Sequence, residues 1–317
     1  MRLIERDTTS SKRTGMPGVR RSWLSKCAAL TILGFLLAWP AMANDIVLLR
    51  DDFDGPSLDT TKWFVPTGPG TFFGRTQIRP PSEVLVVTGG VIRLQLDTFN
   101  PTAVVPGDSF WGSEIDTIET FAVGSGLSFA ARVRFVSGLP GGLVGSLFSF
   151  VFLPSIPGHD EIDFELLSND VVAAEERVLT NVFDDDDFSQ AGDKSFANVV
   201  GLDLTTFHTY EIRWFADHVE WFVDGNLVRS GSDTVPDDPQ NIRLNFWAPD
   251  AFFTEAYDAT LVPAAAVENN DIYYYEVDFV EIRRLEESVP ALGAIAWIAL
   301  GSLLMLANWR FARRTPR

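Results

Sequence analysis

Short apolar runs, each bounded by turn-forming residues, recur along most of this sequence and restrict its fold more than any other feature. The runs are rich in Val, Ile, Phe and Tyr, and Gly, Pro, Asn and Asp separate them. Clear examples occupy residues 83–97, 127–138, 143–154, 209–228 and 273–285. Because each run alternates or is continuously apolar over the length of a strand, the sequence predicts β-strands throughout.

No internal repeat and no long amphipathic helical pattern interrupts these runs. Regularly spaced short strands predict an all-β domain, either an antiparallel sandwich or a jelly roll. The turn "VDGN" at 223–226 predicts a hairpin, because Asp-Gly readily adopts positive φ angles. We expect one domain over residues 44–288, since about 245 residues is an ordinary size for such a fold.

Residues 1–43 are organised like a secretory signal peptide. A basic stretch containing Arg20 and Arg21 precedes an apolar stretch at 28–37, and the small residues "AMA" end at Ala43. We expect cleavage after Ala43. The paired arginines also resemble a twin-arginine export signal, so both export routes stay open.

The chain has one cysteine, Cys27, which lies before the apolar stretch of the expected signal. A lipoprotein cysteine would follow that stretch. The exported domain is therefore expected to have neither a disulfide nor a thiol nucleophile.

Residues 289–317 form a three-part tail. A Val289-Pro290 motif is followed by an uncharged span at 291–307 and by an arginine cluster at 310–317. The span is about the minimum length for crossing a membrane, and its basic flank favours an external position for the preceding domain. The tail resembles the PEP-CTERM-type sorting signals that exosortases process, with a plain tail anchor as the alternative.

The balance of charge restricts the partners. The chain has 43 Asp and Glu against 25 Lys and Arg, which gives a formal net charge of −18. Such a charge repels phosphate backbones and anionic lipids, so nucleic acid is not expected as a partner. A neutral polymer is compatible with it.

The run "HDEIDFELL" at 159–167 places Glu161, Asp163 and Glu165 at alternate positions. In a strand, residues i, i+2 and i+4 share one face, so the three carboxylates lie in a row. Crowding of this kind costs stability and raises the pKa of at least one carboxyl group. Either catalysis uses the row or it is the solvated face of an edge strand, and the pattern alone leaves both readings open.

In its context this run resembles the catalytic strand of glycoside hydrolase family 16, in the unbulged ExDxE form of lichenases and xyloglucan endotransglucosylases. Further matches follow in the family's order and spacing: "DDFDGPSLDTTKW" (51–63), "GSEIDTIETF" (112–121), "TNVF" (180–183), "FHTYEIRW" and "VEWFVDG" (207–225), "NFW" (245–247) and "YYEVDFVEI" (274–282). The resemblance covers roughly residues 46–284.

The resemblance implies a concanavalin A-like jelly roll of two curved antiparallel sheets with a glycan groove on the concave side. It also implies retaining endo-hydrolysis of a β-linked glucan or galactan. By position, Glu161 is then the nucleophile, Asp163 its assisting carboxyl and Glu165 the general acid/base. A retaining pair needs carboxyl groups about 5–5.5 Å apart, so the side chains of the two glutamates must converge.

The resemblance further assigns substrate contacts to Glu114, His159, Asn181, Asn245 and Trp247. For His159 the alternative is a loop histidine near the edge of the cleft. For Trp247 the alternative is a core aromatic rather than a platform for a sugar ring.

Two aspartates complete the comparison with the family. Asp116 departs from it, because lichenases carry arginine at this position, and this leaves the identity of the bound sugar open. Asp278 matches a position that binds a structural calcium in several members, and the alternative is an ordinary aspartate at a strand end. The hydrolysis requires no cofactor, and we expect a monomer.

Several functions remain compatible with these residues. The favoured one is a retaining endo-β-glycosidase at the cell surface or in the periplasm, acting on a glucan-type polysaccharide. A transglycosylase on the same substrates is a close variant. A non-catalytic glycan-binding protein or a structural surface protein is the alternative, although neither needs three aligned carboxylates.

Overall fold

The computed structural model describes residues 45–66, 72–80, 86–152, 158–184 and 192–286. All of them belong to one compact unit. The signal expected at 1–43 and the tail expected at 289–317 lie outside the described residues. In the part of the chain that is described, no helix is long and apolar enough to cross a membrane.

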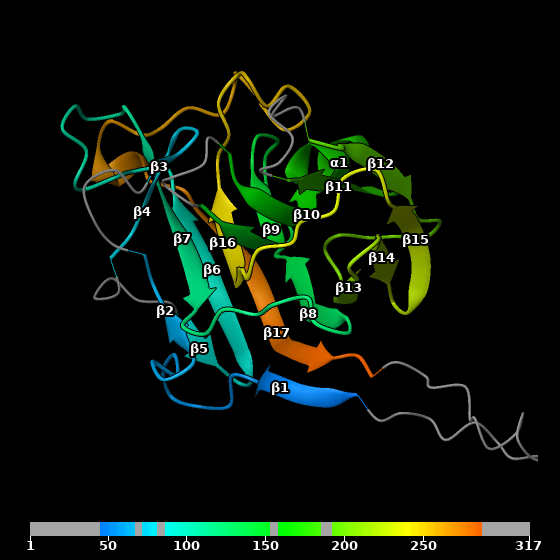
Figure 1. The fold of residues 1–317 in the computed structure, drawn as a ribbon. Coiled ribbons are helices and arrows are strands. Elements are labelled where there is room, and N and C mark those ends of the chain that lie inside the picture. Colours follow the sequence, from blue (N-terminus) through cyan, green and yellow to red (C-terminus); the bar gives the residue numbers. More distant parts are fainter. Residues whose placement is uncertain (1–44, 67–71, 81–85, 153–157, 185–191, 287–317) are drawn as a thin grey trace, which may run out of the picture. The chain divides into compact units, whose positions relative to one another are not determined.

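Two layers of strands form this unit (Figure 1), and we call the first layer the back sheet. Its strand order is β5, β6, β17, β8, β13, β14, β15, and β1 pairs with the second half of β17. Neighbouring strands are antiparallel. The bounds are β1 Ile46–Asp51, β5 Val86–Thr88, β6 Val91–Asp97, β8 Leu127–Phe135, β13 His208–Trp214, β14 Val219–Val223, β15 Asn226–Gly231 and β17 Ile272–Arg284.

The second layer, the front sheet, has the order β2, β7, β16, β9, β10, β11, β12. Its strands are β2 Trp63–Phe64, β7 Phe110–Thr117, β9 Val144–Val151, β10 Asp160–Leu167, β11 Arg177–Phe183, β12 Ser195–Asn198 and β16 Asn241–Trp247. The remaining elements are β3 Phe72–Phe73, β4 Thr76–Ile78, the helix α1 Ser168–Ala173 and the 3-10 helix η2 Val267–Asn269. β4 lies parallel to β7, and β7 also meets β6, so β7 links the two sheets.

The all-β expectation is confirmed, and the predicted runs coincide with strands. The run 127–138 contains β8, the run 143–154 contains β9, and the run 273–285 overlaps β17. The predicted hairpin joins β14 to β15, where Asp224 and Gly225 have φ angles of 49° and 75°. An Asp-Gly pair is suited to this turn because both central residues need positive φ.

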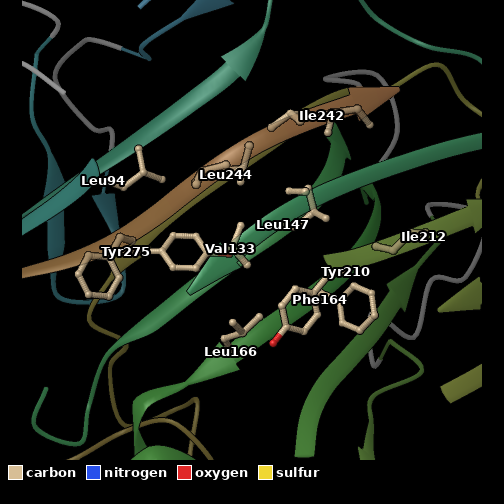
Figure 2. Close-up of a cluster of buried hydrophobic side chains, with 14 of the residues drawn as sticks. Leu94, Val133, Leu147, Phe164, Leu166, Tyr210, Ile212, Ile242, Leu244 and Tyr275 are labelled. Atoms are coloured by element: carbon tan, nitrogen blue, oxygen red, sulfur yellow. The ribbon is translucent and has the colours of Figure 1, made fainter. Parts of the chain in front are cut away.

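The core fills the space between the two sheets (Figure 2). Phe164 of β10 packs edge-on against Tyr210 of β13, with ring centroids 5.3 Å apart. Phe246 of β16 lies 5.9 Å from Phe135 of β8. Burying each such ring fully contributes about 1.5–3 kcal/mol, so these contacts hold the front sheet firmly against the back sheet.

Two polar contacts fix the position of β10. The indole N–H of Trp221 on β14 donates a hydrogen bond of 3.0 Å to the backbone carbonyl of Asp163. At the start of β10, the buried carboxylate of Asp160 accepts the backbone N–H groups of Asp237 and Asp238 at 3.1 and 3.0 Å. Both contacts come from other strands or loops, so tertiary structure locates this strand.

Candidate active site

The two faces of β10 differ as the alternation predicted. Ile162, Phe164 and Leu166 are 0% exposed and face the core. Glu161, Asp163 and Glu165 face the other way and line a cleft on the outer face of the front sheet. β10 lies between β9 and β11, so the row is not on an edge strand.

The cleft has a volume of about 890 Å³. Side chains at alternate positions of β9, β10, β11 and β16 form its floor, and loops at both ends of the strands form its walls. It is lined by Phe73, Gly74, Ser146, Phe148, Phe150, His159, Glu161, Asp163, Glu165, Asn181, Phe183, Lys194, Arg243, Asn245, Trp247, Asp250, Phe252 and Phe253. Six Phe and Trp247 share this lining with acidic, basic and amide side chains, and such a mixture suits an organic ligand that offers both apolar faces and hydrogen-bonding groups.

Glu165 has the electrostatics of a proton donor. Burial, and after it the negative charge of Glu161, raises the pKa of Glu165 to about 8, while Lys194 acts in the opposite direction. The Glu165 carboxyl group therefore carries a proton at neutral pH. A general acid must start protonated, so this environment suits that role.

The environment of Asp163 also disfavours its charged form. Burial raises its pKa well above the ordinary value, and the charges of Glu161 and Glu165 on either side raise it further. Its Oδ1 is buried and has no hydrogen-bond partner among the described residues. Because the three groups interact, their protons belong to the row as a whole.

His159 contacts the first carboxylate of the row. Its Nε2 lies 2.8 Å from Oε2 of Glu161. The imidazole lies between two rings of the cleft, with centroid distances of 5.3 Å to Phe150 and 4.7 Å to Phe183. His159 thus holds the carboxylate of Glu161 and also forms part of the cleft.

Asn181, Asn245 and Trp247 lie where the resemblance placed them, on the cleft lining. Asn181 of β11 stands directly opposite Asp163 in the strand register. Oδ1 of Asn245 is buried and lacks a partner within the described part of the chain. Trp247 is half-buried: it lines the cleft, its ring centroid lies 6.1 Å from that of Phe253, and it also packs against the small buried cluster that contains Val144 and Leu167.

Glu114 lies at a different depth from the other predicted residues. Its side chain is 0% exposed and is not part of the cleft lining. Arg243 of β16 lies next to it and does line the cleft, with Nη1 at 3.6 Å from Oε1 of Glu114 and 3.5 Å from Oδ2 of Asp116. The carboxylates of Glu114 and Asp116 therefore lie beneath the guanidinium of Arg243, on the side away from the cleft.

Sequence reasoning missed Arg243, although a signal was present. In "NIRLNFW" the residues alternate, so Arg243 shares a face with Asn245 and Trp247. It also missed the phenylalanines of the cleft and Lys194, whose Nζ pairs with Glu255 at 2.6 Å.

Asp278 is located on the back sheet, where it meets a cation of the protein itself. Its Oδ2 accepts a hydrogen bond of 2.6 Å from Arg132. Among the described residues, no cluster of carboxylate or imidazole ligands includes Asp278. The calcium role of Asp278 stays a prediction.

The fold and the carboxylate row together define a β-sandwich hydrolase of glycosidic bonds. Residues 80–262 match Glycosyl hydrolases family 16, and the chain belongs to this family. Its membership confirms the class of enzyme that the sequence resemblance indicated.

Among relatives, the chain is 28% identical over 203 residues to Endo-1,3-1,4-beta-glycanase ExoK of Rhizobium meliloti (strain 1021), covering 63% of this chain and 68% of that protein. It is 31% identical over 107 residues to a beta-glucanase of Paenibacillus polymyxa, covering 33% of this chain but 42% of that protein.

Solved structures share the fold. A lichenase from a mouse hindgut metagenome superposes with a TM-score of 0.59 at 22% identity, over 74% of this chain and 98% of that one. The catalytic domain of a laminarinase from Thermotoga petrophila RKU-1 gives a TM-score of 0.61 at 18% identity, over 77% of this chain and 99% of that one. These matches confirm the expected jelly roll.

Proposed function

We propose that this chain is a retaining endo-β-glucanase that cleaves a β-linked glucan by double displacement. The observation that carries the proposal is the row on β10, in which Glu165 keeps a proton up to about pH 8 and shares the floor of an open cleft with Glu161. The names of the relatives, an endo-1,3-1,4-beta-glycanase and a beta-glucanase, support β-glucan as the substrate class.

In the first step, Glu165 donates its proton to the glycosidic oxygen while a carboxylate oxygen of Glu161 attacks the anomeric carbon. The bond to the leaving sugar breaks, and a glycosyl ester on Glu161 forms. His159, which lies 2.8 Å from Glu161, orients the attacking carboxylate. Asp163 provides a second carboxyl group next to Glu161 and strengthens this orientation.

In the second step, Glu165 acts as the base. Esterification removes the charge of Glu161, which is one of the causes that raise the pKa of Glu165. The pKa of Glu165 therefore falls, and its carboxylate takes a proton from the attacking water. Water displaces Glu161 from the anomeric carbon, and the product keeps the β configuration.

The test is release of reducing ends by the full-length protein from mixed-linkage β-glucan, laminarin, xyloglucan and agarose. Glu161→Gln should abolish release, and Glu268→Gln, at an exposed residue of η2, is the matched control. We expect release from at least one glucan and a loss of roughly a thousandfold or more in Glu161→Gln, which corresponds to about 4 kcal/mol of barrier.

Equal release by wild type and folded Glu161→Gln would refute the proposal. Transfer to a labelled acceptor sugar without release of reducing ends would indicate transglycosylation, in which an acceptor sugar replaces water. Binding of glucan with neither reaction would indicate a glycan-binding protein.

We further propose that the chain is exported and acts in the periplasm or at the cell surface. The sequence features of residues 1–43 and 289–317 support this, and an exosortase-type enzyme is the partner that such a tail would require. Intact-mass analysis of the protein from an envelope fraction provides the test. A mass that lacks residues 1–43 is expected, and an uncleaved protein in the cytosol would contradict the proposal.

A further inference from the structure

Buried polar atoms without partners gather beside the catalytic row. Within the described residues, Oε1 of Glu114, Oδ1 of Asp116, Nε of Arg243 and Oδ1 of Asn245 make no hydrogen bond. Each such group costs about 1–3 kcal/mol unless a ligand or water satisfies it. All four lie on β7 and β16, so the carboxylates of β10 do not account for them.

Arg243 is the member of this cluster that faces the cleft. Its side chain is 18% exposed, whereas those of Glu114 and Asp116 are 0% and 1% exposed. Its guanidinium lies 4.6 Å from the ring centroid of Phe150, which limits its rotation. Arginine presents its N–H donors in a rigid fork, so a fixed guanidinium offers paired donors to one ligand.

The charges around Arg243 favour a neutral ligand. Burial, and then the charge of Asp116, raises the pKa of Glu114 well above its ordinary value. Burial also raises the pKa of Asp116, which Arg243 holds down at about 6. Burial therefore disfavours the charged form of both carboxyl groups, and Arg243 is the cation that opposes this shift in each. An anionic ligand would also meet the acidic row on β10.

The strand register places Arg243 at a definite distance from the reaction centre. Arg243 stands opposite Phe148 of β9, and Phe148 stands opposite Asp163 of β10. Two strand spacings separate the backbones of Arg243 and Asp163, which is about 10 Å. Arg243 therefore lies on the β16 side of the carboxylate row, where its guanidinium can contact a ring next to the one that is cleaved.

We propose that Arg243 binds substrate: its guanidinium donates paired hydrogen bonds to hydroxyl groups of a neutral pyranose ring near the scissile bond, while Glu114 and Asp116 position it. The proposal rests on the proposed function, since it assigns one sugar position of the same cleft. Arg243 thus provides a specificity determinant on β16, directly opposite the unusual Asp116.

The test uses full-length protein carrying Glu161→Gln, to which neutral β-glucan oligosaccharides of increasing length are titrated by calorimetry. Arg243→Lys keeps the positive charge but loses the paired N–H donors of the guanidinium. We expect the affinity to rise sharply when the oligosaccharide becomes long enough to reach Arg243. In Arg243→Lys this rise should be roughly tenfold smaller, because a hydrogen bond to a charged group contributes a free energy of about this size. Shorter oligosaccharides should bind both proteins equally.

Arg284→Lys, at an exposed position of β17, is the matched control and should leave every affinity unchanged. Asp116→Asn removes the carboxylate that positions Arg243. It should also reduce the gain in affinity from the sugar unit that reaches Arg243, but less than Arg243→Lys does. Thermal melting of each variant shows whether the fold is intact.

Three outcomes would overturn the proposal. The first is an unchanged length dependence in Arg243→Lys. The second is an equal loss at every length with a lower melting temperature, which indicates a purely structural residue. The third is binding that depends on Arg243 only for a uronate-containing oligosaccharide. Hydrolysis by the wild-type protein is measured separately, so a failure here is distinguishable from a failure of the proposed function.

Discussion

The two faces of β10 have opposite chemistry although they belong to one strand of eight residues. The core face presents Ile162, Phe164 and Leu166, which are 0% exposed and stabilise the sandwich. The cleft face presents three carboxyl groups, of which Asp163 and Glu165 have raised pKa values. A raised carboxyl pKa means that the folded state disfavours the charged form. The apolar face offsets the cost of the catalytic one.

The largest effect is expected on the core face. Phe164→Ala removes a fully buried ring that packs edge-on against Tyr210. We expect a loss of about 3–5 kcal/mol in the free energy of unfolding, because the cavity cannot close completely. Urea denaturation followed by tryptophan fluorescence measures it. A loss below ~1 kcal/mol would mean that this face contributes little to stability.

On the cleft face, replacing the ionisable carboxyl group of Glu165 by a neutral amide should instead stabilise the protein at high pH. Glu165 has a folded-state pKa of about 8 against an ordinary value of 4.5, so folded protein binds more protons than unfolded protein between these pH values. Stability therefore falls as pH rises through this window. Glu165→Gln should be more stable than wild type at pH 8 by on the order of a few kcal/mol, and nearly equal to it at pH 5.

Melting temperatures of both proteins between pH 4 and 9 measure this difference, with Glu268→Gln as the control. A difference between Glu165→Gln and wild type that does not change with pH would contradict the proposed electrostatics.

The activity should depend on the same proton. Because Glu165 must donate a proton, kcat/KM should fall about tenfold for each pH unit above roughly 8, which corresponds to about 1.4 kcal/mol per unit. Initial rates on a soluble β-glucan between pH 5 and 10 measure this decrease in kcat/KM. A profile that stays flat to pH 10 would exclude Glu165 as the acid.

The smallest effect is expected where the two faces are connected through the backbone. Trp221→Phe removes the hydrogen bond of 3.0 Å to the carbonyl of Asp163. We expect a loss of about 1 kcal/mol for this hydrogen bond and a further loss for the reduced ring. Trp214→Phe loses the same ring volume and an indole hydrogen bond of 2.8 Å to the carbonyl of Pro236, so it is the matched control and should lose a similar free energy of unfolding. Only Trp221→Phe should also lower kcat.

Many strands and the row of carboxylates were predictable from the sequence, because they depend on the local alternation of residues. The row on β10, the runs that became β8, β9 and β17, and the Asp-Gly hairpin all follow from neighbouring residues. The depth of Glu114 was not predictable. It depends on Arg243, which the register of β7 and β16 brings alongside from more than a hundred residues away.

The contact of Asp278 has the same origin. Arg132 of β8 reaches it across a sheet whose register shifts between Val277 and Phe279. A sequence pattern predicts which face a residue occupies, but it does not predict the partner that a distant strand supplies.

The most direct test of the central claim is to trap the covalent intermediate. Full-length protein is incubated with a 2-deoxy-2-fluoro β-glucosyl oligosaccharide that has an activated leaving group, and its peptides are mapped by mass spectrometry. The account predicts one glycosyl group on the peptide that contains Glu161, and no label in Glu161→Gln. A label on another residue, or no label in a protein that hydrolyses the parent glucan, would contradict it.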